Sequence, residues 1–349
     1  FDHVHLKERG VFKKNPTGGF LQPRPPYLLD GEGPRPFEAV PEVGEHQDSI
    51  EPRKRPQPGI APAVGQHPDL PLAGIRVIDT TAWWAGPSAC QMLAYLGADV
   101  VKVEAIQRPD GMRMAGGIYI SEPSWWERSA ITLAANTNKR GITLNLTDPA
   151  GLDLCKKLIA ECDVFIENFS PRVIENFGLD WEHIHKINPK AIVVRMPAFG
   201  LSGPWRDNVG FAQTMEQMSG LAWMTGHADD QPRIQRGPCD PLAGMHAAFA
   251  TQVALAEREQ TGRGHLLECS MIEGALNAAA ELAVEWSAYG VELERDGNRS
   301  PQGAPQNVYA CAGNENWLAL VVRDDSEWNA LKEVLGHPSW AEDEELSTH

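Results

Sequence analysis

Residues 72–104 read LAGIRVIDTTAWWAGPSACQMLAYLGADVVKVE and show which class of fold to expect. Residues 75–79 form a short β-branched run, which is typical of a buried strand. A helix then begins near Pro87 and ends at Gly97, since proline suits the first turn of a helix and glycine its end. Residues 100–104 are the next strand. Strand, helix and strand at this spacing predict a βαβ unit and hence a parallel sheet.

The alternation of strands and helices continues along the chain. Further strands are predicted at 142–146, 164–167, 191–195, 265–269 and 317–322, and helices at 149–161, 171–177, 181–187, 242–259 and 272–289. The fold class is therefore α/β, with a doubly wound parallel sheet over about residues 72–282. Ligands of such sheets bind on the loops after the strands. These loops are residues 80–87, 105–115, 168–172 and 196–205.

The composition excludes several classes of function. The chain has 349 residues with 31 Lys and Arg against 47 Asp and Glu, a net charge of −16. Such a chain repels nucleic acids and anionic membranes, so neither is expected as a partner. No apolar run approaches the ~20 residues of a membrane span. The six scattered cysteines have no C-x-x-C pair and no zinc-ligand spacing, so we expect reduced thiols, a cytoplasmic location and no metal.

The pattern around Asp240 and the Asn136–Arg140 cluster each permit two interpretations. Asp240-Pro241 heads a predicted helix, so Asp240 is either the N-cap of that helix or a nucleophile, and the two roles are compatible. A carboxylate at a helix N-terminus is ionised and close to backbone donors, which suits a nucleophile. Residues 136–140 fix a strand edge, hold a phosphate or form a solvated turn, and the pattern favours the turn.

Motifs spread over residues 72 to about 322 resemble those of one enzyme family. They are the 72–79 and 96–104 runs, Ala85-Gly86-Pro87, Asn138-Lys139-Arg140-Gly141-Ile142, Glu167-Asn168-Phe169, Gly203-Pro204, Ser219-Gly220-Leu221, Thr225-Gly226, Thr261-Gly262-Arg263-Gly264 and Gly297-Asn298-Arg299. In order and spacing they closely resemble family III CoA-transferases, the CaiB/BaiF group with the formyl-CoA and carnitine CoA-transferases. The resemblance implies a Rossmann-like CoA-binding large domain joined to a smaller second domain, with two such chains interlocked.

The resemblance also assigns roles to particular residues. Asp240, four residues before Gly244-Met245-His246, matches the catalytic aspartate. The positions that hold coenzyme A in the family match Trp84, Ala85, Leu144, Asn145, Thr147, Asn168, Phe169 and Ser170. The implied substrates are an acyl-CoA and a small carboxylic acid. Ala105 stands where some members carry a basic residue, and no glycine-rich loop surrounds Gly303-Ala304-Pro305, which argues against oxalate or formate specificity.

Residues 1–50 carry a second resemblance, to the C-terminal end of a family module. The chain begins at Phe1, and we expect it to be a piece of a tandem two-module protein. Its expected layout is a C-terminal tail of the preceding module over 1–50, a linker over 51–71, the CoA-binding large domain over 72–282, and a linker with the truncated beginning of a small domain over 283–349. The implied assembly is an interlocked homodimer or a pseudo-dimer of tandem modules.

The resulting hypothesis is transfer of CoA between carboxylic acids through an aspartyl anhydride and an aspartyl-CoA thioester on Asp240. One alternative is an enzyme similar to the α-methylacyl-CoA racemases, whose Gly-His-Asp run is replaced here by Gly210-Phe211-Ala212. Another is a non-catalytic, CoA-binding half of a tandem protein. The acyl group and the acceptor acid stay open.

Overall fold

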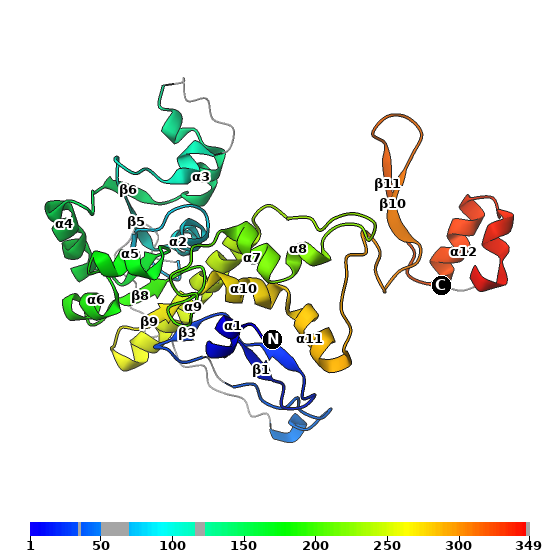
Figure 1. Cartoon of the computed structure of the whole chain (residues 1–349), viewed down its shortest axis with the longest axis horizontal. Helices are drawn as coiled ribbons and strands as arrows, with labels where there is room; N and C mark the ends of the chain where they lie inside the picture. The colour runs from blue at the N-terminus through cyan, green and yellow to red at the C-terminus, as the bar shows by residue number, and fades with distance from the viewer. Residues whose placement is uncertain (34–35, 50–69, 116–122, 347–349) are drawn as a thin grey trace. The chain divides into compact units, whose positions relative to one another are not determined.

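The computed structural model describes residues 1–33, 36–49, 70–115 and 123–346. They form two compact units, of which the larger comprises Phe1–Leu221 and Gln235–Glu292. The smaller unit comprises Ala222–Ile234 and the described part of Leu293–His349. Figure 1 shows both units and the labels of the helices and strands.

The larger unit is built on a mostly parallel sheet. Within the described residues its strands are β3 (Leu28–Leu29), β4 (Arg76–Asp79), β5 (Asp99–Glu104), β6 (Arg140–Thr143), β7 (Val164–Glu167), β8 (Ile192–Arg195) and β9 (Leu266–Glu268), in the order β3-β9-β8-β7-β4-β5-β6. Strands β4 to β9 are parallel, and β3 adds an antiparallel edge. This order winds outward in both directions from the β4–β7 pair, as in a Rossmann fold. The predicted fold class is confirmed.

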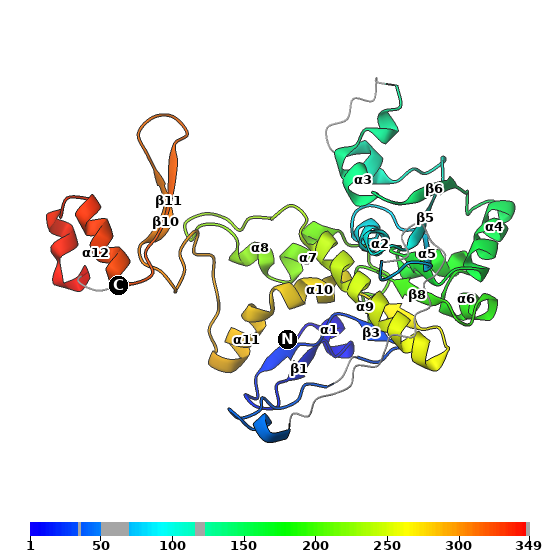
Figure 2. The ribbon, with the colours of Figure 1, turned by 180° about the vertical axis from the view of Figure 1, so that it is seen from behind.

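Both faces of the sheet are buried because successive apolar residues of a strand point to opposite sides. Val77 packs in one core and Ile78 in the other. The helices whose residues join Val77 are α2 (Ala85–Tyr95), α7 (Ala212–Met218), α9 (Cys239–Thr261) and α10 (Met271–Ala278), and those on the Ile78 side are α4 (Pro149–Ala160), α5 (Pro171–Asn176) and α6 (Trp181–Ile187). The long α9 packs along α2 (Figure 2). Gly244 permits this approach, since a Cβ there would lie 2.9 Å from the Ala85 carbonyl oxygen.

The N-terminal segment is docked on the same sheet. It contains α1 (Val4–Glu8), β1 (Phe12–Lys14) and β2 (Leu21–Pro23) before β3. The blue segment lies beside α11 (Ala280–Tyr289) in both views (Figures 1 and 2), and β3 pairs with β9. Arg9 donates to Glu268 and to Glu273, and all three side chains are buried. Arg24 pairs with the other oxygen of Glu273. Phe12 and Tyr27 of this segment pack against the core of the sheet.

The smaller unit holds an antiparallel hairpin and a helix. The hairpin pairs β10 (Gln306–Ala310) with β11 (Trp317–Val321), and α12 (Asp325–Val334) follows. Its small core gathers Val322, Trp328 and Ala341. The remaining α-helices of the described residues are α3 (Ala130–Ala135) and α8 (Leu221–Met224), and the other short helices are of the 3-10 type. No helix among the described residues is long and apolar enough to cross a membrane.

Most predicted elements are confirmed within two residues, and three differ in extent. The helix expected over 242–259 begins three residues earlier, at Cys239. The helix expected over 272–289 is divided at Ala279 into α10 and α11. The strand expected at 142–146 instead spans Arg140–Thr143, because the backbone of residues 145–148 turns to begin α4 at the Asp148 cap. Residues 51–69 of the predicted linker lie outside the described residues. The division into family modules stays a prediction.

Candidate active site

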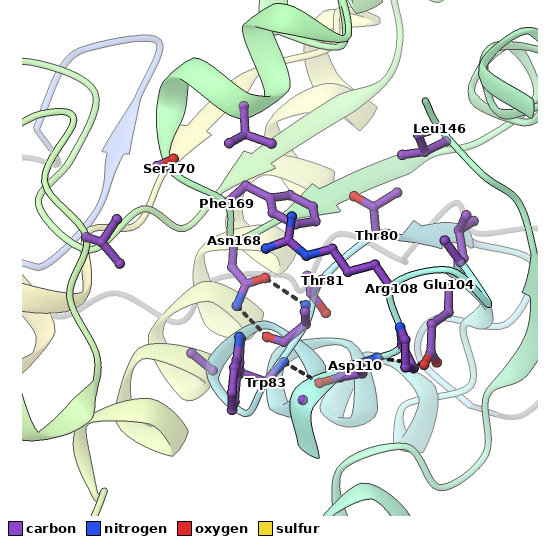
Figure 3. Close-up of a pocket in the computed structure, with 18 of the residues that line it drawn as sticks. Thr80, Thr81, Trp83, Glu104, Arg108, Asp110, Leu146, Asn168, Phe169 and Ser170 are labelled. Atoms are coloured by element: carbon purple, nitrogen blue, oxygen red, sulfur yellow. Dashed lines mark hydrogen bonds between the residues drawn. The ribbon is translucent and has the colours of Figure 1, made fainter. Parts of the chain in front are cut away.

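A cavity of about 520 Å3 opens at the carboxyl ends of the parallel strands (Figure 3). Its walls come from the loops after β4, β5, β6, β7 and β8 and from the first turn of α9. The predicted site residues that line it are Ala85, Leu144, Asn145, Thr147, Asn168, Phe169, Ser170 and Asp240. Trp84 does not line it: its half-buried indole packs against Gly237 instead. One cavity thus brings together eight residues that lie far apart in the sequence.

Asn168 joins the two loops where the winding of the sheet reverses. Its Nδ2 donates to the Ala82 carbonyl oxygen at 2.7 Å, and its Oδ1 accepts from the Ala82 N–H at 2.8 Å (Figure 3). Next to it, the Phe169 N–H donates to Glu167, which is buried and paired with Arg195. The loop after β7 is therefore fixed by side chains of its own strand and by the loop after β4.

Trp83 is held in an unusual backbone conformation at the cavity wall. Its φ of 64° lies in the left-handed region, which a bulky residue rarely adopts. The buried Asp110 carboxylate accepts from the Trp83 N–H at 2.9 Å and from the Met112 N–H at 3.1 Å. The indole packs on Gly111, where a Cβ would lie 2.4 Å from the ring, and meets Phe211 edge-on at 5.4 Å. Strain of this kind concentrates at functional sites.

One charged side chain that lines the cavity is paired, and another has no ion-pair partner among the described residues. Glu104 is held by two hydrogen bonds from Arg113, which together with the Asp110 N–H lower the pKa of Glu104 although burial opposes this. Arg108 is the one basic residue among the described residues that line the cavity. Its exposed guanidinium makes no ion pair with any part of the chain that the structure describes. In Figure 3 it extends across the cavity toward Asn168 and Phe169.

Asp240 is the second residue of α9 and not its N-cap, so the capping interpretation is wrong. The N-cap is Pro238, because Arg236 and Gly237 turn the chain with φ of 67° and 111° and α9 begins at Cys239. Within the described residues, the Asp240 carboxylate accepts no hydrogen bond. Burial, and then the charge of the nearby Glu216, raise the pKa of Asp240 to about 6.

The donor cluster before β6 forms the turn that the pattern favoured, with Thr137 and Asn138 exposed, and one of its side chains is buried in addition. The Lys139 ammonium is buried and donates to Asp79 and to the Pro87 and Asn136 oxygens, each at 2.9 Å. Arg140 pairs with Asp99 at the surface. Lys139 therefore joins β4, the start of α2 and the turn before β6. The described residues hold no group of three or more His, Cys, Asp or Glu suited to a metal ion.

Three residues around the cavity were not predicted as functional. Arg108 and Asp110 lie in the loop after β5, where the fold class predicted ligand contacts. The sequence does not show that Asp110 is held by the Trp83 N–H whereas Arg108 has no ion-pair partner among the described residues, because this depends on tertiary contacts. Glu216 lies on α7 and gave no local signal at all.

The sequence of this chain is similar to those of known enzymes. The family model for CoA-transferase family III matches residues 72–349. A succinyl-CoA–D-citramalate CoA-transferase of Chloroflexus aurantiacus is 36% identical over 81% of this chain and 69% of its own. A succinate–glutarate CoA-transferase of Agrobacterium fabrum is 33% identical over 80% and 70%.

Solved structures agree with the sequence relatives. A CAIB/BAIF family protein from Brucella suis superposes with a TM-score of 0.73 at 31% identity, over 80% of this chain and 73% of that one. With more than two thirds of the chain matched by the family and by relatives above 30% identity, this chain belongs to CoA-transferase family III.

Proposed function

We propose that the protein transfers CoA from an acyl-CoA to a carboxylic acid, with Asp240 as the nucleophile. One observation carries this proposal: Asp240 lines the same cavity as the residues matched to CoA binding. A thioester held along those loops would have its reactive carbon within the space that the carboxylate faces.

The first half-reaction loads CoA onto the enzyme. The Asp240 carboxylate attacks the thioester carbonyl, the C–S bond breaks, and a mixed anhydride forms as CoA leaves as its thiolate. The thiolate then attacks the Asp240 carbonyl of the anhydride. The C–O bond breaks, which frees the donor acid and leaves an aspartyl-CoA thioester.

The second half-reaction is the reverse with a new acid. The acceptor carboxylate attacks the aspartyl thioester and releases the thiolate, and the thiolate attacks the acceptor carbonyl of the new anhydride. Acyl-CoA leaves and the Asp240 carboxylate is restored. Each addition creates an oxyanion, which backbone N–H groups of the loops around the cavity would stabilise.

The protonation state of Asp240 suits this role. With its pKa at about 6, roughly nine tenths of the side chain is ionised at pH 7, so no general base is required. A carboxylate that accepts no hydrogen bond within the described residues also keeps its lone pairs for the substrate.

Arg108 is proposed to bind the anionic part of CoA. The protein carries a net charge of −16, so a polyanionic ligand requires a local cation. Arg108 supplies a guanidinium without an ion-pair partner among the described residues, and a guanidinium is suited to bind phosphate with two parallel hydrogen bonds. It stands three residues after Ala105, the position where the family resemblance places a basic residue.

Succinyl-CoA is the proposed donor. The relatives named for succinyl-CoA and D-citramalate or L-malate are 31–36% identical, and a formyl-CoA:oxalate CoA-transferase of Bradyrhizobium diazoefficiens is 33% identical. Identity alone does not separate the two groups. The sequence argues against formate and oxalate, because the glycine-rich loop is missing near Gly303.

The racemase alternative is not favoured by the site. The residue matching the racemase aspartate is Ala212, which is buried and cannot carry a proton. Its neighbour Phe211 lines the cavity and contacts Trp83.

Mass spectrometry tests the proposal. The protein is incubated with succinyl-CoA, formyl-CoA and other acyl-CoAs, and hydroxylamine is added to convert an aspartyl thioester to a hydroxamate. We expect the hydroxamate at residue 240 with succinyl-CoA. A hydroxamate on another carboxylate would refute Asp240 as the nucleophile. The assay contains no acceptor acid, so nothing would discharge an aspartyl thioester once it had formed. If CoA binds under these conditions and neither adduct nor product is found, the non-catalytic alternative is favoured.

A further inference from the structure

Glu216 is a buried carboxylate outside the cavity that the proposed reaction does not use. It lies on α7 with no exposed surface. Its Oε1 accepts from the Gly237 N–H at 2.6 Å, and its Oε2 has no hydrogen-bond partner among the described residues. A buried carboxylate oxygen without a partner costs stability, so such a group in a native fold requires an explanation.

The contact of Glu216 with Gly237 lies directly before the N-cap of α9, Pro238. Gly237 has a φ of 111° and packs against Trp84, where an added Cβ would lie 3.0 Å from the indole. The chain passes from there through Pro238 into the first turn of α9, whose second residue is Asp240. The Glu216 carboxylate is therefore a tether between α7 and the turn that presents Asp240.

We propose that Glu216 is a positioning residue, which fixes the turn before α9 through the Gly237 N–H and thereby sets the direction and reactivity of the Asp240 carboxylate. This inference rests on the proposed function of Asp240. Glu216 itself does not line the cavity, so it acts through Asp240 and does not touch the substrate.

The electrostatics support this role. Burial first, and Glu216 second, raise the pKa of Asp240 to about 6. A more basic carboxylate is the better nucleophile in a Brønsted series. The other titratable groups on the elements packed around α9 have little effect: the Cys239 and Cys90 thiols have raised pKa values, Glu273 is paired with Arg9 and Arg24, and burial lowers the pKa of His246.

The expected pH dependence follows from the sign of the shift. Because the pKa of Asp240 is raised, its carboxylate forms only as pH rises through about 6, and adduct formation is lost as pH falls below it. Removing the charge of Glu216 lowers the pKa of Asp240. The acid limb of the profile then moves to lower pH.

The experiment measures the rate of adduct formation on residue 240 from pH 4.5 to 8 at saturating succinyl-CoA, about the range in which carboxyl groups of raised pKa titrate. Glu216→Gln keeps an oxygen for the Gly237 N–H and removes the charge. We expect its midpoint to fall by about one pH unit. Glu216→Ala also removes the tether, and we expect about tenfold slower adduct formation at pH 8 with an unchanged Kd for CoA. Glu182→Gln, an exposed carboxyl on α6, removes the same charge elsewhere and should match the wild type.

The outcomes separate the two proposals. An adduct on Asp240 in the wild type, with the same midpoint in Glu216→Gln and the same rate in Glu216→Ala, would overturn the role of Glu216 and leave the proposed function intact. If the midpoint of the pH profile moved equally in Glu182→Gln, the role of Glu216 would be overturned as well, because the change in net charge alone would then explain the effect. No adduct on residue 240 in the wild type would refute both.

Discussion

Arg108 and Asp240 carry opposite charges in the same cavity, and their surroundings differ. Arg108 is exposed and unpaired within the described residues, whereas Asp240 is largely buried beside a second carboxylate. Under the proposed function, the first arrangement would offer an anion a cation that has no ion-pair partner among the described residues. The second would leave the carboxylate free to react, since no hydrogen bond from the described residues reaches it.

Replacing Arg108 by glutamine should weaken CoA binding. The change removes the one basic side chain among the described lining residues, and a lost charge-assisted hydrogen bond corresponds to about a tenfold higher Kd. Isothermal titration with CoA measures the effect. Lys186→Gln, an exposed charge on α6, is the matched control. Equal Kd values for both variants would show that Arg108 does not contact the ligand.

Replacing Asp240 by asparagine should abolish transfer and leave the fold more stable at neutral pH. A raised carboxyl pKa means that stability is fully present below the unfolded pKa of 3.8 and is lost as pH rises through about 6. A neutral side chain avoids this loss, so we expect a gain of about 3 kcal/mol in the free energy of unfolding at pH 8. Urea unfolding at pH 8 and pH 4 measures the difference, which should shrink at pH 4. Retained turnover, or lower stability at pH 8, would contradict the assignment.

Sequence patterns indicated some residues of the candidate site and missed others. Asp240 and the loop residues Leu144 and Asn168 were indicated by motif order, because their neighbours in the sequence are distinctive. Glu216 was not, because its contact with the Gly237 N–H crosses 21 residues and depends on how α7 meets α9. The helix start at Cys239 also depended on the positive φ of Arg236 and Gly237, which no propensity indicates for arginine.

The strand β6 and its neighbours show how charge is used to join elements. Lys139 and Arg140 are adjacent in the sequence, yet the first is buried with Asp79 and the second is exposed with Asp99. Asp79 is fully buried at the end of β4. Burial alone would raise the pKa of its carboxyl, but Lys139 and Lys102 outweigh it and hold the pKa at about 2.

Replacing Lys139 by methionine should destabilise the larger unit strongly, whereas Arg140→Met should not. Removing one partner of a buried pair leaves an uncompensated charge and costs about 3–5 kcal/mol. Losing an exposed pair costs about 1 kcal/mol or less. Chemical unfolding of both variants at pH 7 gives the comparison. Equal losses would mean that Asp79 finds another partner, for which Lys102 is the candidate.

The boundaries of helices and strands were predictable where they depend on neighbouring residues in the sequence alone. The strands β4, β5, β7 and β8 follow short β-branched runs. Asp148 caps α4 by accepting from the Ala150 N–H, so this helix begins where it was predicted, at residue 149. The two-residue strand β3 was not predictable, because Leu28 and Leu29 become a strand only by pairing with Glu268 and Leu267. Contacts across more than 200 residues leave no local periodicity.

At the scale of the whole molecule, the position of the cavity follows from topology. Strands wind outward from the β4–β7 pair, so the loops after these two strands diverge and leave a space at their carboxyl ends. Asn168 and Ala82 close the base of this space, and the loops after β5 and β6 extend it. With a net charge of −16 the protein as a whole repels an anion, so an anionic ligand requires a local arrangement of this kind.

Binding of CoA should therefore protect separate loops together. In hydrogen–deuterium exchange we expect slower exchange in residues 80–85, 144–147 and 168–170 when CoA is added, because one ligand spans loops that follow β4, β6 and β7. The Asp240→Asn variant should show the same protection without turnover, which separates binding from chemistry. The antiparallel pair of β1 and β2 lies on the N-terminal segment, contributes no residue to the cavity, and serves as the internal reference. Protection confined to residues 1–33 would place CoA elsewhere, and protection of only one of the three loops would refute a ligand that bridges the carboxyl edge of the sheet.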